Sequence, residues 1–349
     1  MPKIRVGILC GGQSSEHEIS CISAAGVFNA IDRDRFEPLL IGITRTGTWV
    51  HIANADSLVI SEGQMPEVNP GLPKITVDIH GLALARSPLN LDVIFPMLHG
   101  PYGEDGTIQG LCEIAGIRYV GSGVLASAVA MDKSFAKPIF QSHGLQVAPG
   151  VVLNKKNWTL DQLQNMIYPF FVKPARSGSS RGTTKVKRAE ELSAAIAEAF
   201  EFDTKVLVEE AIVGREIECA VLDVGGELRA APIGEIKIVG DHEFYDFQAK
   251  YLDDATEVVF PTDLPEGVER SIQSAAIAAF EAVGCEGLAR VDFFYTASGE
   301  LVINEINTMP GFTPTSMFPK MWARAGKSYS EIITHLLDAA LARPLGVTR

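Results

Sequence analysis

Two carboxylates and one amide side chain are expected on the same face of a β-hairpin near the C-terminal end of the chain. Alternating apolar residues flank the turn Ser298-Gly299, which is typical of a hairpin. With the turn centred there, Asp292 lies opposite Glu305, and Asn307 points the same way because strand side chains alternate between faces. Facing carboxylates destabilise a sheet unless a cation compensates them. A Mg²⁺ ion bound with substrate phosphates fits this pattern, and the apolar neighbours disfavour the alternative, a solvated outer face.

A segment rich in glycine and serine, residues 177–182, lies between two predicted short strands. Its backbone N–H groups and hydroxyls can cradle phosphate oxygens, although an ordinary flexible loop has the same composition. Lys173, at the end of the first of these strands, and Lys133, at a predicted helix start, are candidate phosphate contacts. Each lysine alone is equally consistent with a solvated surface residue.

Glu16 and Glu18 follow a strand and a glycine pair, where a helix is expected to begin. Either carboxylate can simply interact with the positive end of the helix dipole. In the functional interpretation, Glu16 holds the ammonium group of a substrate. None of His17, His99 and His242 has the spacing of metal ligands.

One resemblance to a nucleotide-binding motif is rejected and another is disfavoured. Residues 326–328, Gly-Lys-Ser, would end a P-loop, but Met321 stands where the leading glycine is required and no strand precedes it. Residues 121–126 match the dinucleotide pattern G-x-G-x-x-A, but no acidic residue ends a second strand about 20 residues later. The second motif is therefore predicted to be a tight turn from a strand into a helix.

Strand and helix alternate in the first third of the chain, which favours a parallel sheet with ligands beyond the carboxyl ends of its strands. The middle third is expected to form a smaller unit, and the last third begins with several strands. The predicted strands are 5–10, 38–43, 91–97, 170–173, 183–187 and 205–210, and the predicted helices are 20–31, 189–200, 268–283 and a capped helix at 328–342.

Length and composition bound the class of protein. At 349 residues the chain is long for one core, so two or three domains are expected. A 46% apolar share indicates a globular protein, and the net charge of −13 disfavours nucleic acid as a partner. No apolar run approaches the roughly 20 residues of a membrane helix. The five scattered cysteines disfavour disulfides and zinc, and they fit a reducing cytoplasm.

Nine segments spread along nearly the whole chain form one set. They are 11–20 (GGQSSEHEIS), 99–110 (HGPYGEDGTIQG), 131–133 (MDK), 171–174 (FVKP), 178–180 (GSS), 214–218 (GREIE), 245–251 (YDFQAKY), 289–292 (ARVD) and 304–311 (NEINTMPG). Any one of them could match by chance, but the full set in register is highly specific, and it resembles the D-alanine–D-alanine ligases of the ATP-grasp superfamily.

The resemblance implies an α/β (α+β) ATP-grasp fold with a nucleotide held between the central and C-terminal domains. The expected domains are 1–125, a Rossmann-like parallel sheet that binds substrate; 126–214, a small α+β lid; and 215–349, an antiparallel-sheet catalytic domain with a mobile loop at about 241–254. The resemblance also implies ATP and two D-alanine molecules as substrates, and two Mg²⁺ ions, with Mn²⁺ as an alternative and a monovalent cation as an optional addition. It further implies a cytoplasmic homodimer that serves peptidoglycan synthesis.

The resemblance also assigns roles by position. The expected nucleotide contacts are Lys133, Lys173, Ser180, Glu209, Glu210, Ile212 and Glu216, and the expected metal ligands are Asp292, Glu305 and Asn307. The expected catalytic residues are Glu16, Ser179, Tyr251, Arg290 and Gly311, and the expected substrate contacts are His99, Lys250 and Ser316.

The implied reaction begins when the carboxylate of the first D-alanine attacks the γ-phosphate of ATP. The amine of the second D-alanine then attacks the resulting acylphosphate. Glu16 would hold the first ammonium, Ser316 and Lys250 the second carboxylate, and Arg290 with the Gly311 N–H the developing oxyanion.

Three alternatives remain open. A relative that uses D-lactate or D-serine as second substrate would share most segments, although Lys250-Tyr251 favours an amine over lactate. An NAD-dependent oxidoreductase built on 121–126 leaves the paired carboxylates unexplained, and intact metal and phosphate residues disfavour a non-catalytic nucleotide-binding module. Arg181 departs from the family, whose flap more often has a small apolar residue there.

Overall fold

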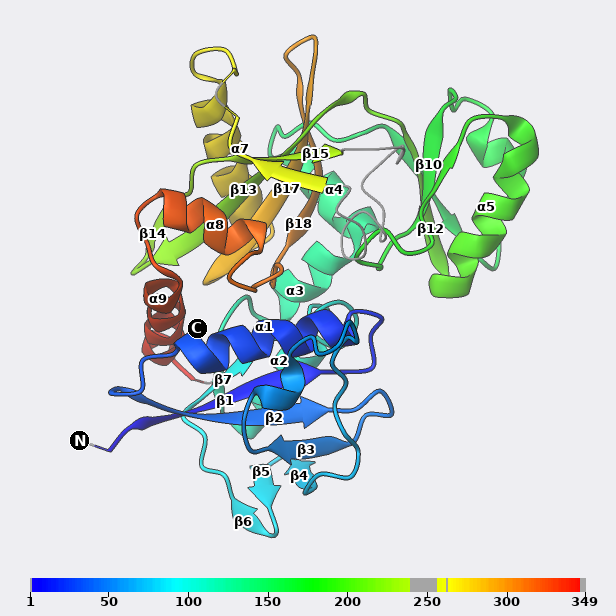
Figure 1. Cartoon of the computed structure of the whole chain (residues 1–349). Coiled ribbons are helices and arrows are strands. Elements are labelled where there is room, and N and C mark those ends of the chain that lie inside the picture. Colours follow the sequence, from blue (N-terminus) through cyan, green and yellow to red (C-terminus); the bar gives the residue numbers. More distant parts are fainter. Residues whose placement is uncertain (1, 239–255, 262, 346–349) are drawn as a thin grey trace.

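The computed structural model describes residues 2–238, 256–261 and 263–345. Three main sheets divide the chain, with the N-terminal sheet at the bottom of Figure 1, a small sheet beside α5, and a larger sheet at the top. The loop predicted at about 241–254, with Lys250 and Tyr251, lies outside the described residues. Within the described ranges, no helix is both long and apolar enough to span a bilayer.

The N-terminal sheet has the strand order β3-β2-β1-β7-β8. Its parallel strands are β1 (Ile4–Gly11), β2 (Phe36–Ile43), β7 (Val93–Pro96) and β8 (Arg118–Tyr119), accompanied by α1 (His17–Ala30) and α2 (Thr107–Ala115). Nearly continuous apolar runs suit strands that are buried on both faces. The predicted parallel sheet is confirmed for these four strands, and α1 begins three residues earlier than the predicted Ser20.

Antiparallel additions to this sheet were not predicted. β3 (Trp49–Ile52) pairs antiparallel with β2 at the edge of this sheet. A separate antiparallel sheet consists of β4 (Ile75–Asp78), β5 (Gly81–Leu84) and β6 (Ser87–Pro88), and a short helix, η1 (Asp56–Leu58), follows β3. These strands are only two to four residues long. Such short segments carry little periodicity, so sequence patterns cannot identify them.

The central sheet is antiparallel, in the order β11-β10-β12-β9. It consists of β9 (Gly150–Asn154), β10 (Phe170–Pro174), β11 (Thr184–Val186) and β12 (Lys205–Glu210), with η2 (Leu160–Leu163) and α5 (Ala189–Phe202). Buried Phe170 and Val172 of β10 pack with Ile196 and Ala199 of α5. The predicted strands and helix of this unit are confirmed to within two residues at each end.

The C-terminal sheet is antiparallel, in the order β16-β15-β13-β17-β18, with β14 beside β13. Its strands are β13 (Gly214–Val224), β14 (Glu227–Ala230), β15 (Gly234–Ile238), β16 (Thr256–Val259), β17 (Leu288–Thr296) and β18 (Leu301–Asn307). On one face, α4 (Lys133–Ser142) and α7 (Val268–Ala282) pack through Phe140 and Phe280 against Phe293 of β17. α3 (Val124–Met131) precedes α4 and follows the turn at 121–123, as predicted.

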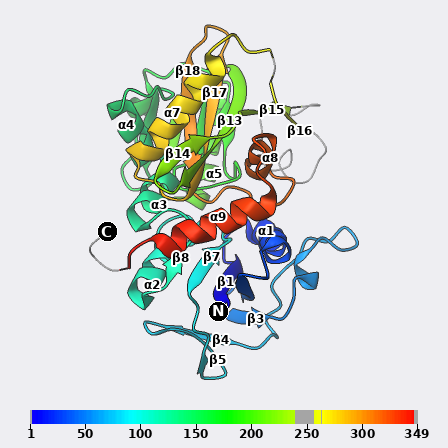
Figure 2. The same cartoon turned by 90° about the vertical axis from the view of Figure 1, so that its left-hand side faces the viewer.

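A shared core joins the C-terminal sheet to the N-terminal domain. α9 (Tyr329–Ala342) runs between the two in Figure 2, and α8 (Met317–Arg324) packs beside it. Ile332 and Leu336 of α9 belong to one buried cluster with Ile8 of β1 and Leu222 of β13. The relative position of these two domains is therefore fixed by apolar burial.

The predicted facing of Asp292 and Glu305 is confirmed in the β17–β18 hairpin. The outer part of the hairpin pairs Phe293 with Ile303, and a bulge between Asp292 and Phe293 then shifts the register by one residue. Because of the bulge, Asn304 and Glu305 both line the same pocket although they are consecutive in the strand.

Ser328 begins α9 with a capping box, in which its Oγ accepts from the Glu331 N–H at 3.3 Å and Glu331 Oε2 accepts from the Ser328 N–H at 2.8 Å. We predict that Ser328→Ala lowers the free energy of unfolding by about 1 kcal/mol, since it removes the hydroxyl that accepts from the Glu331 N–H. Urea denaturation measures the change, with Ser328→Thr as a control that keeps a hydroxyl. An unchanged unfolding midpoint in Ser328→Ala would contradict the prediction.

Candidate active site

A pocket of about 1050 Å³, open to solvent, lies between the central and C-terminal sheets. It is lined by residues from β10, the flap 177–182, β12, β13, the β17–β18 hairpin and the start of α4. The predicted site residues that line it are Lys133, Lys173, Ser179, Ser180, Glu209, Glu210, Ile212, Glu216, Arg290, Asp292 and Glu305. The predicted nucleotide contacts and two of the three predicted metal ligands thus meet in one cavity, whereas Asn307 does not line it.

Lys133 is paired with the hairpin carboxylate Glu305. It is the first residue of α4, and its Nζ lies 2.9 Å from Glu305 Oε2 and donates to the Ser177 carbonyl at 3.1 Å. Burial alone would lower the pKa of Lys133, but the nearby carboxylates of Glu305, Glu209 and Glu104 raise it above its ordinary value. Lys133 therefore stays a cation between the flap and the hairpin.

Glu209 is a buried carboxylate held by two lysines. Lys173 Nζ lies 2.6 Å from its Oε2 and also donates to Asn304 Oδ1 at 3.2 Å, and Lys137 Nζ contacts its Oε1. Burial acts to raise the pKa of Glu209, but Lys137 and Lys173 together hold it below the ordinary value. Lys137 was not predicted, although it follows Lys133 by four residues and so shares its helix face.

Arg290 joins the two carboxylates on β13 and β17. Its Nε and Nη2 each lie 2.7 Å from an oxygen of Asp292, and its Nε lies 3.2 Å from Glu218 Oε2. Asn307 Nδ2 donates to Asp292 Oδ2 at 3.0 Å, so all three predicted metal ligands are close to one another or to Arg290. The same carboxylates raise the pKa of Arg290 well above its ordinary value against the effect of burial.

The flap reaches the N-terminal domain at Glu16. The Ser179 hydroxyl donates to Glu16 Oε1, and a side chain at Gly178 or Gly100 would place a Cβ 2.7 Å from Glu16 Oε2. Ser179 and Ser180 both have positive φ, 50° and 55°, which folds the flap over the pocket. Glu16 is buried, and Gly100 and Gly178 approach its carboxylate closely because neither has a side chain.

His99 and Glu104 tie the same N-terminal loop to the turn after β18. His99 Nδ1 lies 3.0 Å from the Met309 carbonyl, while Glu104 accepts from the Met309 N–H at 3.2 Å and from the Gly100 N–H at 2.7 Å. Burial lowers the pKa of His99, and burial with the charge of Glu16 raises the pKa of Glu104 to about 8. Glu104 was not predicted. That His99 lies near a substrate carboxylate stays a prediction.

Gly311 and Ser316 lie in the turn that these contacts position. A Cβ on Gly311 would lie 3.3 Å from Ser316 Oγ, so the two residues are neighbours. The Ser316 hydroxyl accepts from the Thr313 N–H at 3.1 Å. Neither residue lines the main pocket, and their predicted partners Lys250 and Tyr251 lie outside the described residues.

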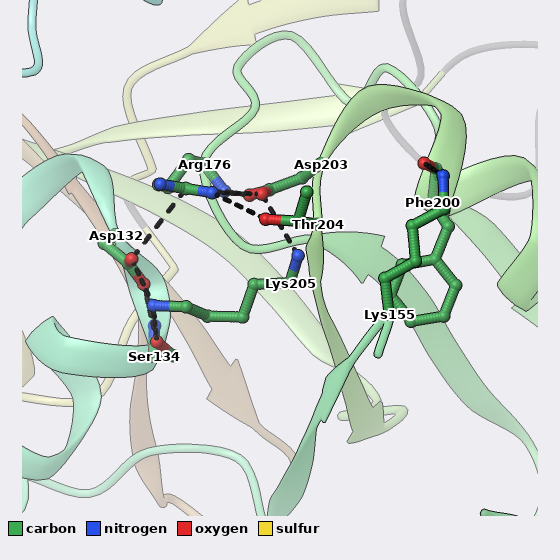
Figure 3. A network of polar contacts seen from close by, with 8 residues as sticks. All are labelled: Asp132, Ser134, Lys155, Arg176, Phe200, Asp203, Thr204 and Lys205. Atoms are coloured by element: carbon green, nitrogen blue, oxygen red, sulfur yellow. Dashed lines mark hydrogen bonds and ion pairs between the residues drawn. The ribbon is translucent and has the colours of Figure 1, made fainter. Parts of the chain in front are cut away.

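A polar network fixes the base of the flap to the start of α4 (Figure 3). Arg176 pairs with Asp203 through Nη2 at 2.5 Å and its backbone N–H, and Lys205 Nζ lies 2.6 Å from Asp132 Oδ2. Asp132 is the N-cap residue of α4, and the next residue, Lys133, donates its backbone N–H to the carbonyl of Ala175. The network thus fixes the position of Lys133 relative to the base of the flap.

Three sheets in this arrangement, with a pocket between the central and C-terminal ones, define the ATP-grasp class of ligases. Family models agree with the class. The model described as D-ala D-ala ligase N-terminus matches residues 5–122, and the one described as D-ala D-ala ligase C-terminus matches residues 139–338. The chain belongs to the D-alanine–D-alanine ligase family.

Individual relatives extend over the full length. A D-alanine–D-alanine ligase of Arthrobacter sp. (strain FB24) is 50% identical in an alignment that covers 99% of this chain and 96% of that protein. The D-Ala:D-Ser ligase VanG of Enterococcus faecalis superposes with a TM-score of 0.86 at 37% identity, covering 97% of this chain and all of that one. A D-alanine–D-alanine ligase of Bacillus anthracis, solved in complex with ATP, gives a TM-score of 0.74 at 27% identity over 97% of both chains.

We predict that Gly178→Ala lowers kcat/KM in the family's reaction by about tenfold to a hundredfold, because the new methyl group displaces the flap from Glu16. The melting temperature should stay close to that of the wild type. Gly110→Ala is a matched control, since its Cβ would meet open space. Steady-state kinetics measure the effect, and wild-type turnover by Gly178→Ala would show that the close approach is unnecessary.

Proposed function

We propose that the chain joins two D-alanine molecules into D-alanyl-D-alanine for peptidoglycan, with ATP cleaved to ADP and phosphate. The observation that carries the proposal is the contact between Glu16 and Ser179, because it joins the flap over the pocket to the N-terminal domain. A carboxylate at that point can hold the ammonium of an amino acid beside the γ-phosphate. The family relationship supports D-alanine as that amino acid.

The nucleotide is proposed to lie along β10 and β12 with its phosphates under the flap. β10 runs antiparallel to β12, so Pro174 at the flap pairs with Val206 and Phe171 pairs with Glu209. Three residues of strand, about 10 Å, separate these two backbone pairs. Lys173 Nζ contacts the Glu209 carboxylate in this structure and is proposed to turn to the phosphates, beside Lys133, when the nucleotide binds. The proposed base contacts are Glu209, Glu210 and Ile212, with Glu216 for the ribose and Ser180 for the phosphates.

The donor set at the hairpin fits Mg²⁺. Within the described ranges no three His, Cys, Asp or Glu side chains form a metal site by themselves. Asp292 and Glu305 with the amide oxygen of Asn307 would therefore leave coordination positions for phosphate oxygens and water, as Mg²⁺ prefers. When bound, two Mg²⁺ ions, or Mn²⁺, would neutralise charge on the transferred phosphoryl group. An additional monovalent cation is part of this proposal.

In the proposed first step, Glu16 holds the ammonium of the first D-alanine while its carboxylate oxygen attacks the γ-phosphorus. The bond from that phosphorus to ADP breaks, and an acylphosphate remains. Lys133 and Lys173 leave their carboxylate partners for the phosphate oxygens, which positions the nucleotide. The flap excludes water, which matters because an acylphosphate hydrolyses readily.

In the second step, the amine of the second D-alanine attacks the acyl carbon and loses a proton, and phosphate leaves. Arg290 and the Gly311 N–H are proposed to stabilise the oxyanion of the tetrahedral intermediate. Ser316 and Lys250 would hold the second carboxylate, and Tyr251 would close over Ser179.

The second substrate has one specific competitor, because the D-Ala:D-Ser ligase of E. faecalis superposes closely on this chain. D-Serine also offers an amine, so the two substrates differ only in a hydroxyl. Comparing D-alanine with D-serine as second substrate, each at saturating ATP, separates the two activities.

Two further features are proposed with the activity. A homodimer is supported by the family resemblance, and the exposed Ile114 of α2 and Leu125 of α3 offer apolar surface for it. A cytoplasmic location is supported by the use of ATP and by five free, buried cysteines.

We predict that purified protein with ATP, Mg²⁺ and D-alanine releases one phosphate for each dipeptide formed. Coupled phosphate release and chromatography of the dipeptide measure both products. L-Alanine should give neither product. Turnover of L-alanine without D-alanine would overturn the proposed substrate.

We predict that Asp292→Asn or Glu305→Gln lowers kcat by about a hundredfold or more, because each removes charge that holds the metal at the phosphoryl group. Glu300→Gln, at the exposed end of the same hairpin, is the control and should retain wild-type kcat. Circular dichroism checks that the variants fold. Near-normal rates in the first two variants would remove these residues from the metal site.

A further inference from the structure

Lys137 is a buried cation in the proposed nucleotide pocket, one helical turn beyond Lys133. It lies four residues, or about 6 Å along the helix axis, beyond Lys133. Its side chain is 6% exposed and contacts Glu209, whose side chain is 5% exposed. Lys133, in contrast, contacts the flap carbonyl of Ser177 and the hairpin carboxylate of Glu305.

Glu209 has one lysine on each carboxylate oxygen. Lys173 holds Oε2, and Lys137 holds Oε1. Lys173 lies on β10 two residues closer to the flap than Phe171, the strand partner of Glu209. It is therefore the lysine that can turn from Glu209 to a phosphate, whereas Lys137 remains beside the base end of the pocket.

Once Lys173 has turned away, Glu209 depends on Lys137 for its charge. A buried carboxylate without a counter-ion takes up a proton, because burial disfavours its ionised form. An ionised carboxylate only accepts hydrogen bonds, so it favours a 6-amino purine and repels a 6-oxo purine. A protonated one also donates, and would tolerate either base.

We propose that Lys137 is a positioning residue that keeps Glu209 ionised during nucleotide binding and thereby sets the preference for a 6-amino over a 6-oxo purine base. The inference rests on the proposed placement of the nucleotide. With Lys173 on the phosphates, Oε2 of Glu209 is free to accept from the amino group while Oε1 stays with Lys137.

The charges around Lys137 are consistent with this role. Burial, followed by the neighbouring cations Lys173 and Lys133, lowers the pKa of Lys137 to about 8 against the opposing effect of Glu209. Removal of Lys173 to a phosphate takes away one of those repulsions and strengthens the remaining pair. The pKa of Lys137 therefore rises when Lys173 contacts the phosphates, so Lys137 stays charged as the counter-ion of Glu209.

The test compares ADP with IDP, which differ at position 6 of the base, by calorimetry with Mg²⁺ on the whole protein. Wild type should prefer ADP. Lys137→Met should lower this preference about tenfold, since Glu209 then takes up a proton and its charge-assisted hydrogen bond to the 6-amino group is lost. Lys137→Arg, which keeps the charge, should retain most of it. Lys137→Gln replaces Lys137→Met if the latter does not fold, as judged by thermal melting.

The variant Glu209→Gln tests whether Lys137 acts through Glu209. The double variant Lys137→Met/Glu209→Gln should show the same ADP preference as Glu209→Gln alone. Equal losses of ADP and IDP affinity in Lys137→Met, additive effects in the double variant, or a wild type without preference would overturn the inference.

Dipeptide formation by the wild type separates this inference from the proposed function. A wild type that forms the dipeptide, with unchanged base preference in Lys137→Met, contradicts only the role of Lys137. A wild type that forms no dipeptide contradicts the proposed function itself.

Discussion

The pairing of buried charges around the pocket that lies between the central and C-terminal sheets is the constraint on which the site depends. Lys133, Lys137, Lys173 and Arg290 all face the pocket, and each contacts a carboxylate. An unpaired buried ion costs several kcal/mol, so the partners must be brought together for the domains to pack. In the proposed function the same pairs would prepare the site for ligands, since phosphate oxygens would replace the carboxylates beside the lysines and metal ions would replace the lysines beside the carboxylates.

The rest of the architecture keeps these partners within reach of one another. The apolar cluster around α9 fixes the N-terminal domain against the C-terminal sheet, and Glu104 with His99 joins the two domains near Gly311. The Arg176–Asp203 pair holds the flap base to the central sheet. The flap contacts Glu16 where glycines allow a close approach, which would couple the proposed amino-acid end of the site to the proposed nucleotide end.

The sequence predicted the long, strongly patterned elements and the hairpin that carries Asp292 and Glu305. It could not predict the bulge that also turns Asn304 toward the pocket, because a bulge leaves no periodic signal. Lys137 could have been found from its spacing to Lys133, but its partner Glu209 is distant in sequence. The Lys133–Glu305 and Lys137–Glu209 pairs follow from how α4 packs beside strands that are distant in sequence, which a single sequence does not reveal.

The central claim is that Lys133 and Glu305 neutralise each other in the protein without ligands. A double-mutant cycle of Lys133→Met and Glu305→Gln, followed by urea unfolding without nucleotide or metal, tests it most directly. The account predicts that each single variant is destabilised and that the double variant recovers part of the loss, with a coupling of about 1–3 kcal/mol. Additive effects, within about 0.5 kcal/mol, would contradict it.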